Sequence, residues 1–189
     1  LAQVHRAVLR QDRHPVAVKI QRPAIEAVIR SDTALIEILA DQIHQHMEKA
    51  AVYNLPALVA EFRKGLTREL DYRREARHMR IFSSNFSDDP QVHIPRLFDE
   101  LCTERMIVME LVKGVNLDRA YPDDPEKRAE LARRGLRIAV VQILEHGFFH
   151  ADPHPGNILV REDDVLCILE CGLVGRITDA IRLRITYLM

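Results

Sequence analysis

The chain has 189 residues, 47% of them apolar and 29% charged, the ordinary mixture of a globular domain. Its formal net charge is −1, so no overall basic field attracts nucleic acid, and we expect no nucleic-acid partner. Cys102, Cys167 and Cys171 show no Cys-x-x-Cys spacing, which argues against a disulfide framework or a zinc site.

Apolar periodicity in the first half of the chain predicts two strands followed by helices. Alternation through Val16, Val18 and Ile20 predicts a strand pair over 3–20, around a polar turn at 12–14. Three- and four-residue steps then predict a helix over 24–50, broken near Ser31, and a second helix over 56–82.

The second half reads as strands, one long helix and a small hairpin. Segments 94–101 and 104–111 are predicted to pair as strands. A helix is expected to begin at Asp124-Pro125 and to end at Gly147, and the runs 157–160 and 165–169 predict a hairpin. The first residue is Leu and the last ones read as a helix, so we expect a piece of a longer protein.

Residues 147–160, "GFFHADPHPGNILV", contain several polar side chains in a short stretch between two apolar runs. Asp152 and Asn157 are separated by four residues, as in the kinase pattern H-R-D-x-x-x-x-N, and His150 stands at the place of the pattern's His. Phosphoryl transfer needs a carboxylate that orients the attacking group and a side-chain oxygen that holds Mg²⁺. The motif therefore predicts a catalytic loop.

Two other readings of this motif stay open at the level of local sequence. Asp, Asn, Pro and Gly are common in turns, so the stretch is also typical of an ordinary turn. Alternatively, His150, Asp152 and His154 alternate like ligands on one strand face, although two prolines interrupt that strand.

Other weak signals accompany the motif in a fixed order along the chain. Lys19 stands among apolar residues in "VAVKI", like the strand lysine that binds ATP phosphates in kinases. Met109 and Glu110 end a strand before a loop with Gly114, as a hinge between two lobes would. "LECG" at 169–172 lies where a kinase carries D-F-G. Together these signals favour a kinase-like catalytic loop over an ordinary turn.

The chain resembles the UbiB family of atypical protein-kinase-like proteins, also called AarF-domain kinases. The matching stretches are "AQVHRA", "VAVKIQRP", "ELDYRREA", "GFFHADPHPGNILV" and "CGLVGR". The resemblance implies an α+β, protein-kinase-like fold. In it, residues 1–112 form a small N-lobe with a family-specific helical insertion, and residues 113–189 form a truncated C-lobe.

The resemblance also implies that the protein uses ATP and Mg²⁺ and supports ubiquinone (coenzyme Q) biosynthesis as a kinase or ATPase. Its partners would be a nucleotide and lipid or quinone precursors, or the proteins of lipid synthesis. We expect a cytoplasmic location, peripheral at a bacterial inner membrane or on the matrix side of an organelle. Membrane attachment would come from segments outside this chain.

The family's functional residues map onto this sequence by resemblance. The catalytic group would comprise Asp152 and His154, and the metal ligands would be Asn157 and Glu170. The residues that bind or support the nucleotide would be Lys19, its acidic partner Glu75, the Glu-x-Asp pair Glu69 and Asp71, and the hinge residues Met109 and Glu110.

Glu170 departs from the family pattern, which has Asp at this position. The extra methylene moves the carboxylate by roughly 1.5 Å, and a misplacement of about 1 Å can cost on the order of 100-fold in rate. Three function classes therefore remain open: an active kinase or ATPase, a nucleotide-binding scaffold with weak or lost turnover, and a small-molecule phosphotransferase of the aminoglycoside or choline kinase type. The stretches "VKIQRP" and "ELDYRREA" argue against the third.

Overall fold

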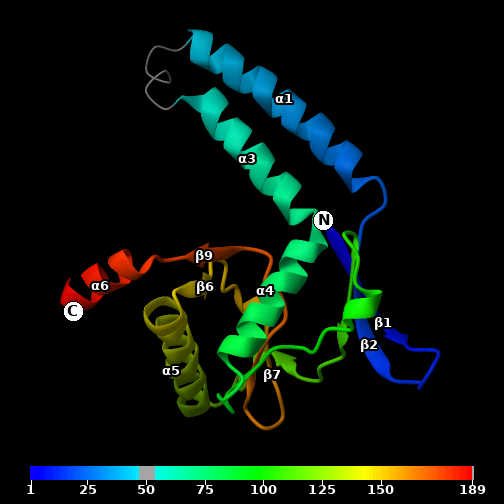
Figure 1. Cartoon of the computed structure of the whole chain (residues 1–189), viewed down its shortest axis with the longest axis vertical. Coiled ribbons are helices and arrows are strands. Elements are labelled where there is room, and N and C mark those ends of the chain that lie inside the picture. Colours follow the sequence, from blue (N-terminus) through cyan, green and yellow to red (C-terminus); the bar gives the residue numbers. More distant parts are fainter. Residues whose placement is uncertain (47–53, 189) are drawn as a thin grey trace.

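A computed structural model describes residues 1–46 and 54–188, which form a mixed α+β fold built around small sheets (Figure 1). The first sheet is antiparallel, in the order β1 (Ala2–Val8), β2 (Pro15–Gln21), β4 (Met106–Glu110). The second has the order β3 (Val92–His93), β8 (Leu166–Ile168), β7 (Ile158–Val160), β5 (Val115–Asn116). A third pairs β6 (Phe148–His150) with β9 (Val174–Arg176).

The helices divide into a projecting hairpin, two helices that contribute to the core and a C-terminal helix that contacts the turn Gln142–His146. The hairpin consists of α1 (Ile25–His46) and α3 (Leu55–Glu69), which lie side by side and extend away from the other elements (Figure 1). The remaining helices are α4 (Tyr72–Asn85), α5 (Pro125–Val141) and α6 (Asp179–Leu188). Short helical turns occupy Asp99–Leu101, Leu117–Arg119, Gln142–His146 and Pro155–Asn157.

The predicted break near Ser31 is wrong, because α1 continues through it to His46. The predicted end of that helix at residue 50 lies outside the described residues. The helix predicted over 56–82 is two helices, since Asp71 has an extended backbone with φ −89° and ψ 94°. Its carboxylate accepts a hydrogen bond from the Arg73 N–H at 3.1 Å and so caps a new helix, α4.

The strand pair predicted over 94–101 and 104–111 is half correct. The second segment contains β4, which pairs with β2 instead of with its neighbour in sequence. The first segment contributes only an isolated bridge between Leu97 and Met109 before the chain turns into the 3₁₀ helix Asp99–Leu101. Pro95 lacks an N–H, which disfavours a continuous strand there.

The predictions for the end of the chain are confirmed. Asp124 caps α5 by accepting a hydrogen bond from the Lys127 N–H at 3.0 Å, and Pro125 is the first residue of the helix. Gly147 ends the helical segment with φ +60°, a conformation that favours glycine. Strands β7 and β8 form the expected antiparallel hairpin.

One main hydrophobic core connects the sheets, and α4 runs through its middle (Figure 1). Met79 and Phe82 of α4 belong to the same core as Ile107 of the first sheet and Leu166 of the second. The face of α4 that these residues share is therefore in contact with both halves of the molecule. Glu75 lies on this buried face, so the packing of α4 decides where its carboxylate points.

We expect Phe82→Ala to lower the free energy of unfolding by about 3–5 kcal/mol, because a ring with 0% exposure would leave a cavity. Urea titration followed by circular dichroism measures the change. Phe62→Ala is the matched control, since Phe62 on α3 is 52% exposed and its loss should cost less than about 0.5 kcal/mol. Equal losses in the two variants would contradict this assignment of the core.

Candidate functional site

Lys19 is a buried lysine whose ammonium contacts two carboxylates. It lies on β2, and the residue is only 8% exposed. Its Nζ donates to Glu75 Oε1 at 2.8 Å and Oε2 at 2.9 Å, and to Glu170 Oε1 at 3.0 Å. The pairing of Lys19 with Glu75 that the resemblance implied is therefore present, and Glu170 joins it.

The two carboxylates reach Lys19 from different elements and differ in exposure. Glu75 follows the cap residue Asp71 by four positions on α4, and its side chain is 5% exposed. Glu170 lies two residues after the end of β8, and its side chain is 46% exposed. Lys19 thus has one buried partner and one partner that is open to solvent.

Electrostatics favour a charged ammonium at this point. Burial by itself lowers the pKa of Lys19, but the negative charges of Glu75 and Glu170 outweigh it and raise the pKa above the ordinary value. Burial raises the pKa of Glu75, and the charge of Lys19 only partly offsets that effect. The ammonium of Lys19 is therefore held in its charged form, and the carboxylates of Glu75 and Glu170 balance its charge in the ligand-free chain.

Tyr72 supports the ammonium from the same face of α4 and was not singled out from the sequence. Its ring centroid lies 5.4 Å from Lys19 Nζ, a distance at which the cation is attracted to the ring face. The residue is 3% exposed, and its hydroxyl finds no hydrogen-bond partner among the described residues. A buried hydroxyl without a partner costs stability.

The predicted catalytic loop is tied to the Glu170 segment through His150. The His150 Nε2–H donates to the Glu170 carbonyl at 2.5 Å, while Nδ1 accepts from the Asp152 N–H at 3.1 Å. The His150 N–H donates to the Gln142 side chain at 2.8 Å, and Ala151 N–H donates to the Leu173 carbonyl at 3.1 Å. These bonds hold the loop beside the segment that carries Glu170.

Within this loop, Asp152 is exposed, and its carboxylate makes no hydrogen bond or ion pair with the described residues. The loop is closed instead by its backbone, since His154 N–H donates to the Asp152 carbonyl at 2.8 Å. The exposed His154 ring accepts the Gly156 N–H at Nδ1, so in the neutral ring the proton is on Nε2. Asp152 and His154 are therefore both available to a ligand.

Asn157 and the segment that carries Glu170 lie at the open end of the β7–β8 hairpin. The Leu169 N–H donates to the Asn157 carbonyl at 2.9 Å, which places Asn157 opposite the neighbour of Glu170. An amide oxygen and a carboxylate are the oxygen ligands that Mg²⁺ prefers when substrate phosphates complete the shell. The donor set therefore fits Mg²⁺ by its chemistry.

The rival metal site at His150, Asp152 and His154 is not supported. Both ring nitrogens of His150 are engaged in hydrogen bonds, so neither is free for a metal. Over residues 1–46 and 54–188, no group of three or more His, Cys, Asp or Glu side chains is placed to hold a metal ion.

The other residues predicted to support a nucleotide lie away from the Lys19 cluster or have structural partners. Glu69 is exposed at the end of α3, and Asp71 caps α4. Met109 is buried in β4, and the Glu110 carboxylate accepts from His93 Nε2 at 2.9 Å and from the Arg96 N–H at 3.1 Å. For these four side chains, contact with a nucleotide stays a prediction.

The connection after Glu110 does have the form expected of a hinge. The chain leaves the first sheet at Glu110 and enters the second at Val115. Gly114 lies between them, where a Cβ would come within 2.7 Å of the Val160 carbonyl oxygen, so a side chain does not fit. The boundary predicted at 112/113 falls in this connection, but β3, from the predicted N-lobe, pairs with β8 of the predicted C-lobe.

Besides Tyr72, two residues of the site carry no local signal in the sequence. His78 on α4 donates through Nδ1 to the Cys171 carbonyl at 2.9 Å and so holds the residue after Glu170. Gln142, which is 4% exposed, positions His150. Both act across the fold, so only their long-range neighbours reveal the role.

Comparison with known proteins agrees with this arrangement. The profile of the ABC1 atypical kinase-like domain matches residues 1–189. Activity of BC1 Complex Kinase 1 of Arabidopsis thaliana, a chloroplastic protein, is 39% identical over 177 residues, covering 93% of this chain and 26% of that protein. A probable protein kinase UbiB of Edwardsiella ictaluri is 34% identical over 190 residues, covering 95% of this chain and 34% of that protein.

A solved structure shares the fold. The Mycobacterium tuberculosis protein Rv3197, solved in complex with erythromycin, superposes with a TM-score of 0.73 at 26% identity. The match covers 93% of this chain and 44% of that one. The chain thus spans about a quarter to a third of the two curated relatives described above and less than half of this structure.

Fold and site together define a protein of the protein-kinase-like class, with a strand lysine paired to a helix glutamate beside a catalytic-type loop. More narrowly, the chain belongs to the ABC1 atypical kinase-like family, which includes proteins named UbiB. The family and the α+β kinase-like fold predicted from the sequence are confirmed. In the described part of the chain, no helix is both long enough and apolar enough to cross a bilayer.

We expect Tyr72→Phe to leave the unfolding free energy unchanged or to raise it by about 1 kcal/mol, because it removes a buried hydroxyl that lacks a partner. Tyr121→Phe is the matched control, since the Tyr121 hydroxyl donates to Asp164 and its loss should lower stability. Thermal and urea unfolding measure both variants. A clear loss of stability in Tyr72→Phe would show that its hydroxyl has a partner in the folded protein.

Proposed function

We propose that this chain binds ATP together with Mg²⁺ and acts as a UbiB-type kinase or ATPase that supports ubiquinone biosynthesis. The observation that carries the proposal is the buried ammonium of Lys19 between Glu75 and Glu170, in a chain of the ABC1 family. A lysine held charged in this way matches the strand lysine that binds nucleotide phosphates in kinases. A lysine that served only solubility would face the solvent.

In this proposal each group of the site has one task. Lys19 binds the phosphates, and Glu75 orients the ammonium. Asp152, whose residue is exposed, would orient the attacking hydroxyl or water. His154 presents the proton on Nε2 to the transferred phosphate. Asn157 and Glu170 would hold Mg²⁺, which when bound neutralises charge on the phosphates.

A second candidate is a nucleotide-binding scaffold with weak or lost turnover. It is favoured by Glu170, whose carboxylate bonds to Lys19 at 3.0 Å in place of the family's shorter Asp. Mg²⁺ requires near-ideal octahedral geometry, so it tolerates a displaced ligand poorly. The two candidates share nucleotide binding and differ only in the rate of phosphoryl transfer.

The partners and the location follow from the family. We propose lipid or quinone precursors, or the proteins that make them, as partners, and a peripheral position at a bacterial inner membrane or in an organelle. The support is the match to bacterial UbiB proteins and to chloroplastic relatives. Because the chain covers only about a third of the UbiB relative described above, membrane attachment would involve segments outside it.

ATP with Mg²⁺ should raise the free energy of unfolding by about 2.7 kcal/mol at 100 times its Kd, because a ligand that binds only the folded state stabilises it. Thermal unfolding with and without Mg²⁺ measures this effect. Lys19→Met should abolish the ATP-induced shift relative to its own ligand-free baseline, whereas Lys127→Met on α5 should keep it. If ATP does not stabilise the unmodified protein against unfolding, both candidate functions are refuted.

Glu170→Asp should raise the turnover of Mg-ATP by up to about 100-fold if the carboxylate position limits the rate. Phosphate release measures turnover, and the ATP-induced thermal shift should stay nearly the same. Glu162→Asp in the exposed turn after β7 is the matched control and should change neither. Unchanged turnover in Glu170→Asp would refute the geometric explanation and favour the scaffold.

A further inference from the structure

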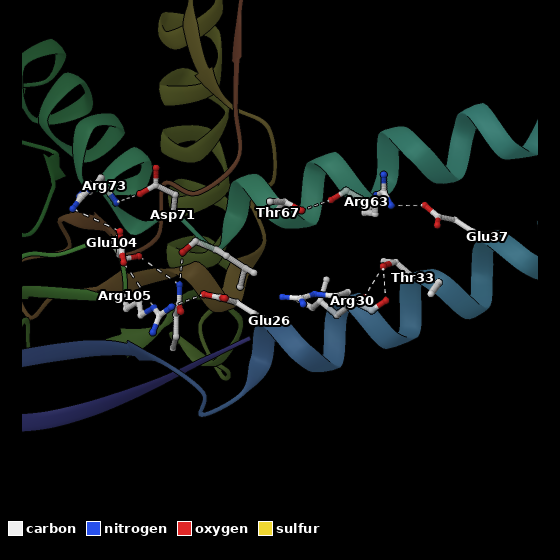
Figure 2. A pocket seen from close by; sticks show the side chains of 14 residues that line it. Glu26, Arg30, Thr33, Glu37, Arg63, Thr67, Asp71, Arg73, Glu104 and Arg105 are labelled. Atoms are coloured by element: carbon white, nitrogen blue, oxygen red, sulfur yellow. Dashed lines mark hydrogen bonds and ion pairs between the residues drawn. The ribbon is translucent and has the colours of Figure 1, made fainter.

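A pocket of about 500 Å³ lies between the helical hairpin and the first sheet (Figure 2). Its walls come from α1, α3, the junction of α3 with α4, the end of β2 and the residues just before β4. Lys19, Asn157 and Glu170 do not line it, whereas Asp71, which was predicted to support the nucleotide, does. Its volume lies in the range of small-molecule sites.

The pocket walls carry four arginines and four carboxylates, most of which neutralise one another. The ion pairs are Arg105 with Glu26 at 2.9 Å, Arg63 with Glu37 at 3.0 Å, and Arg73 with Glu104 at 3.7 Å. The fourth carboxylate, Asp71, is engaged as the cap of α4. Arg30 is thus the one wall arginine without a counter-charge among the described residues.

Arg30 lines the pocket from α1, where Figure 2 shows it between Glu26 and Thr33. Its guanidinium makes no hydrogen bond or ion pair in the described part of the chain, whereas the neighbouring Thr33 hydroxyl is satisfied by the Ile29 carbonyl at 2.7 Å. A guanidinium binds one carboxylate or phosphate through two parallel hydrogen bonds. The pocket therefore offers one position for an anionic group.

The rest of the lining offers apolar contact. Ile29, Ala34 and Leu70 contribute aliphatic surface beside the charged side chains. A ligand that matches both features has a single anionic group on an apolar body. A multiply charged ligand would meet the carboxylates of the paired walls and be repelled.

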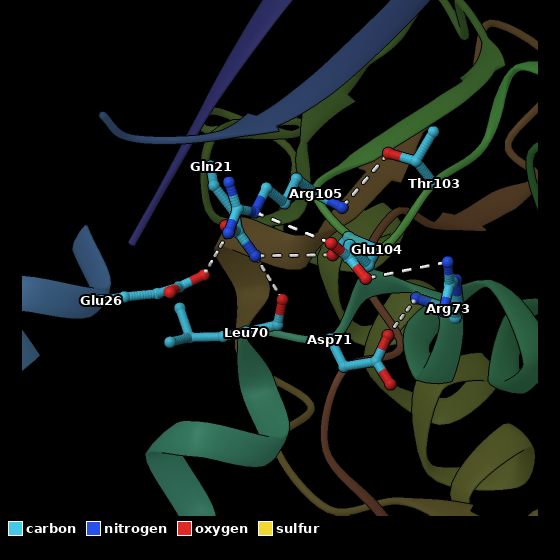
Figure 3. A network of polar contacts seen from close by, with 8 residues as sticks. All are labelled: Gln21, Glu26, Leu70, Asp71, Arg73, Thr103, Glu104 and Arg105. Atoms are coloured by element: carbon cyan, nitrogen blue, oxygen red, sulfur yellow. Dashed lines mark hydrogen bonds and ion pairs between the residues drawn. The ribbon is translucent and has the colours of Figure 1, made fainter. Parts of the chain in front are cut away.

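The wall of the pocket also connects to both partners of the buried ion pair. Gln21 follows Lys19 by two residues on β2, and its side-chain amide donates to the Leu70 carbonyl and, at 3.4 Å, to the Glu104 carbonyl (Figure 3). Leu70 directly precedes Asp71, which caps α4, and α4 carries Glu75. The junction that closes the pocket therefore connects the strand of Lys19 to the start of the helix that carries Glu75.

We propose that this pocket binds a small molecule with one carboxylate or phosphate on an apolar body. Bound there, the molecule fixes the junction of α3 and α4 and favours the pairing of Lys19 with Glu75. The pocket is then a regulatory site. Its effect on nucleotide affinity rests on the proposed function, but its effect on α4 does not.

The first experiment measures binding by calorimetry and ligand-observed NMR on the whole chain. The probes are 2-naphthoate and 2-naphthyl phosphate, whose relative affinities distinguish a carboxylate from a phosphate, and the neutral 2-naphthylmethanol. The anionic probes should bind at least about tenfold more tightly than the alcohol. Arg30→Gln should remove that difference, whereas Arg133→Gln, an exposed arginine on α5, should keep it.

The second experiment measures the link to α4 by amide hydrogen exchange. Saturating 2-naphthoate should slow exchange in the first turns of α4, residues 72–76, without any nucleotide present. Gln21→Ala should remove that protection while naphthoate still binds, because it cuts the connection between β2 and Leu70. ATP affinity should rise several-fold with naphthoate present, and naphthoate affinity should rise by the same factor with ATP.

Equal affinity for the anionic and neutral probes, or no effect of Arg30→Gln, would overturn the assignment of an anion site. Naphthoate binding with unchanged exchange in α4 would overturn the regulatory role. Failure of ATP to bind would refute the proposed function alone, because both the probe affinities and the protection of α4 are read without nucleotide.

Discussion

The structure depends on one buried ammonium that three separate parts of the chain must meet. Lys19 comes from β2, Glu75 from α4 and Glu170 from the segment after β8, and all contacts are within 3.0 Å. An unpaired charge in such a place would cost several kcal/mol, so the fold is constrained to bring both halves of the molecule together around Lys19. Helix α4 meets this constraint because its buried face packs against both sheets, with Phe82 and Met79 below Glu75. The position of the cluster is thus a consequence of core packing, which is stronger than any single ion pair.

Two polar devices give α4 its place. Asp71 interrupts the helical run and starts α4 in a new direction, so the hairpin projects outward while Glu75 turns inward. His78 from α4 and His150 from β6 each donate to a carbonyl of the Glu170–Cys171 segment. These histidines hold the backbone, whereas among the described residues the Glu170 carboxylate is held only by Lys19 and its side chain is 46% exposed. The backbone of the site is therefore rigid at the point where one of its charged side chains is exposed.

The parts of the fold that sequence could predict are those with local causes. The cap at Asp124, the left-handed Gly147 and the β7–β8 hairpin follow from residue chemistry within a few positions, and all three are present. The pairing of Lys19 with Glu75 was predicted from the family resemblance, since no local pattern links residues 56 positions apart.

The predictions that were wrong concern the helix over 56–82 and the strand over 94–101. Apolar periodicity runs through Leu70 and Asp71 without a break, so it hides the cap at Asp71 that divides the helix, although an aspartate is a residue that favours this position. Likewise, segment 94–101 has strand composition, but β4 finds its partner in β2.

Exposure divides the three charges into a fixed pair and an exchangeable third member. Lys19 and Glu75 are both buried, so separating them would leave a charge without solvent or partner. Glu170, with a side chain 46% exposed, can leave Lys19 for water or for a cation at little cost, because Glu75 still neutralises the ammonium. A longer side chain than aspartate also reaches Lys19 more easily from the end of β8. Glu170 thus contacts Lys19 in the ligand-free chain, and the same carboxylate is the one proposed above to hold Mg²⁺. In the proposed function, nucleotide binding would depend on the buried pair of Lys19 and Glu75 and phosphoryl transfer on the exposed Glu170, so the two activities would depend on different carboxylates of one cluster.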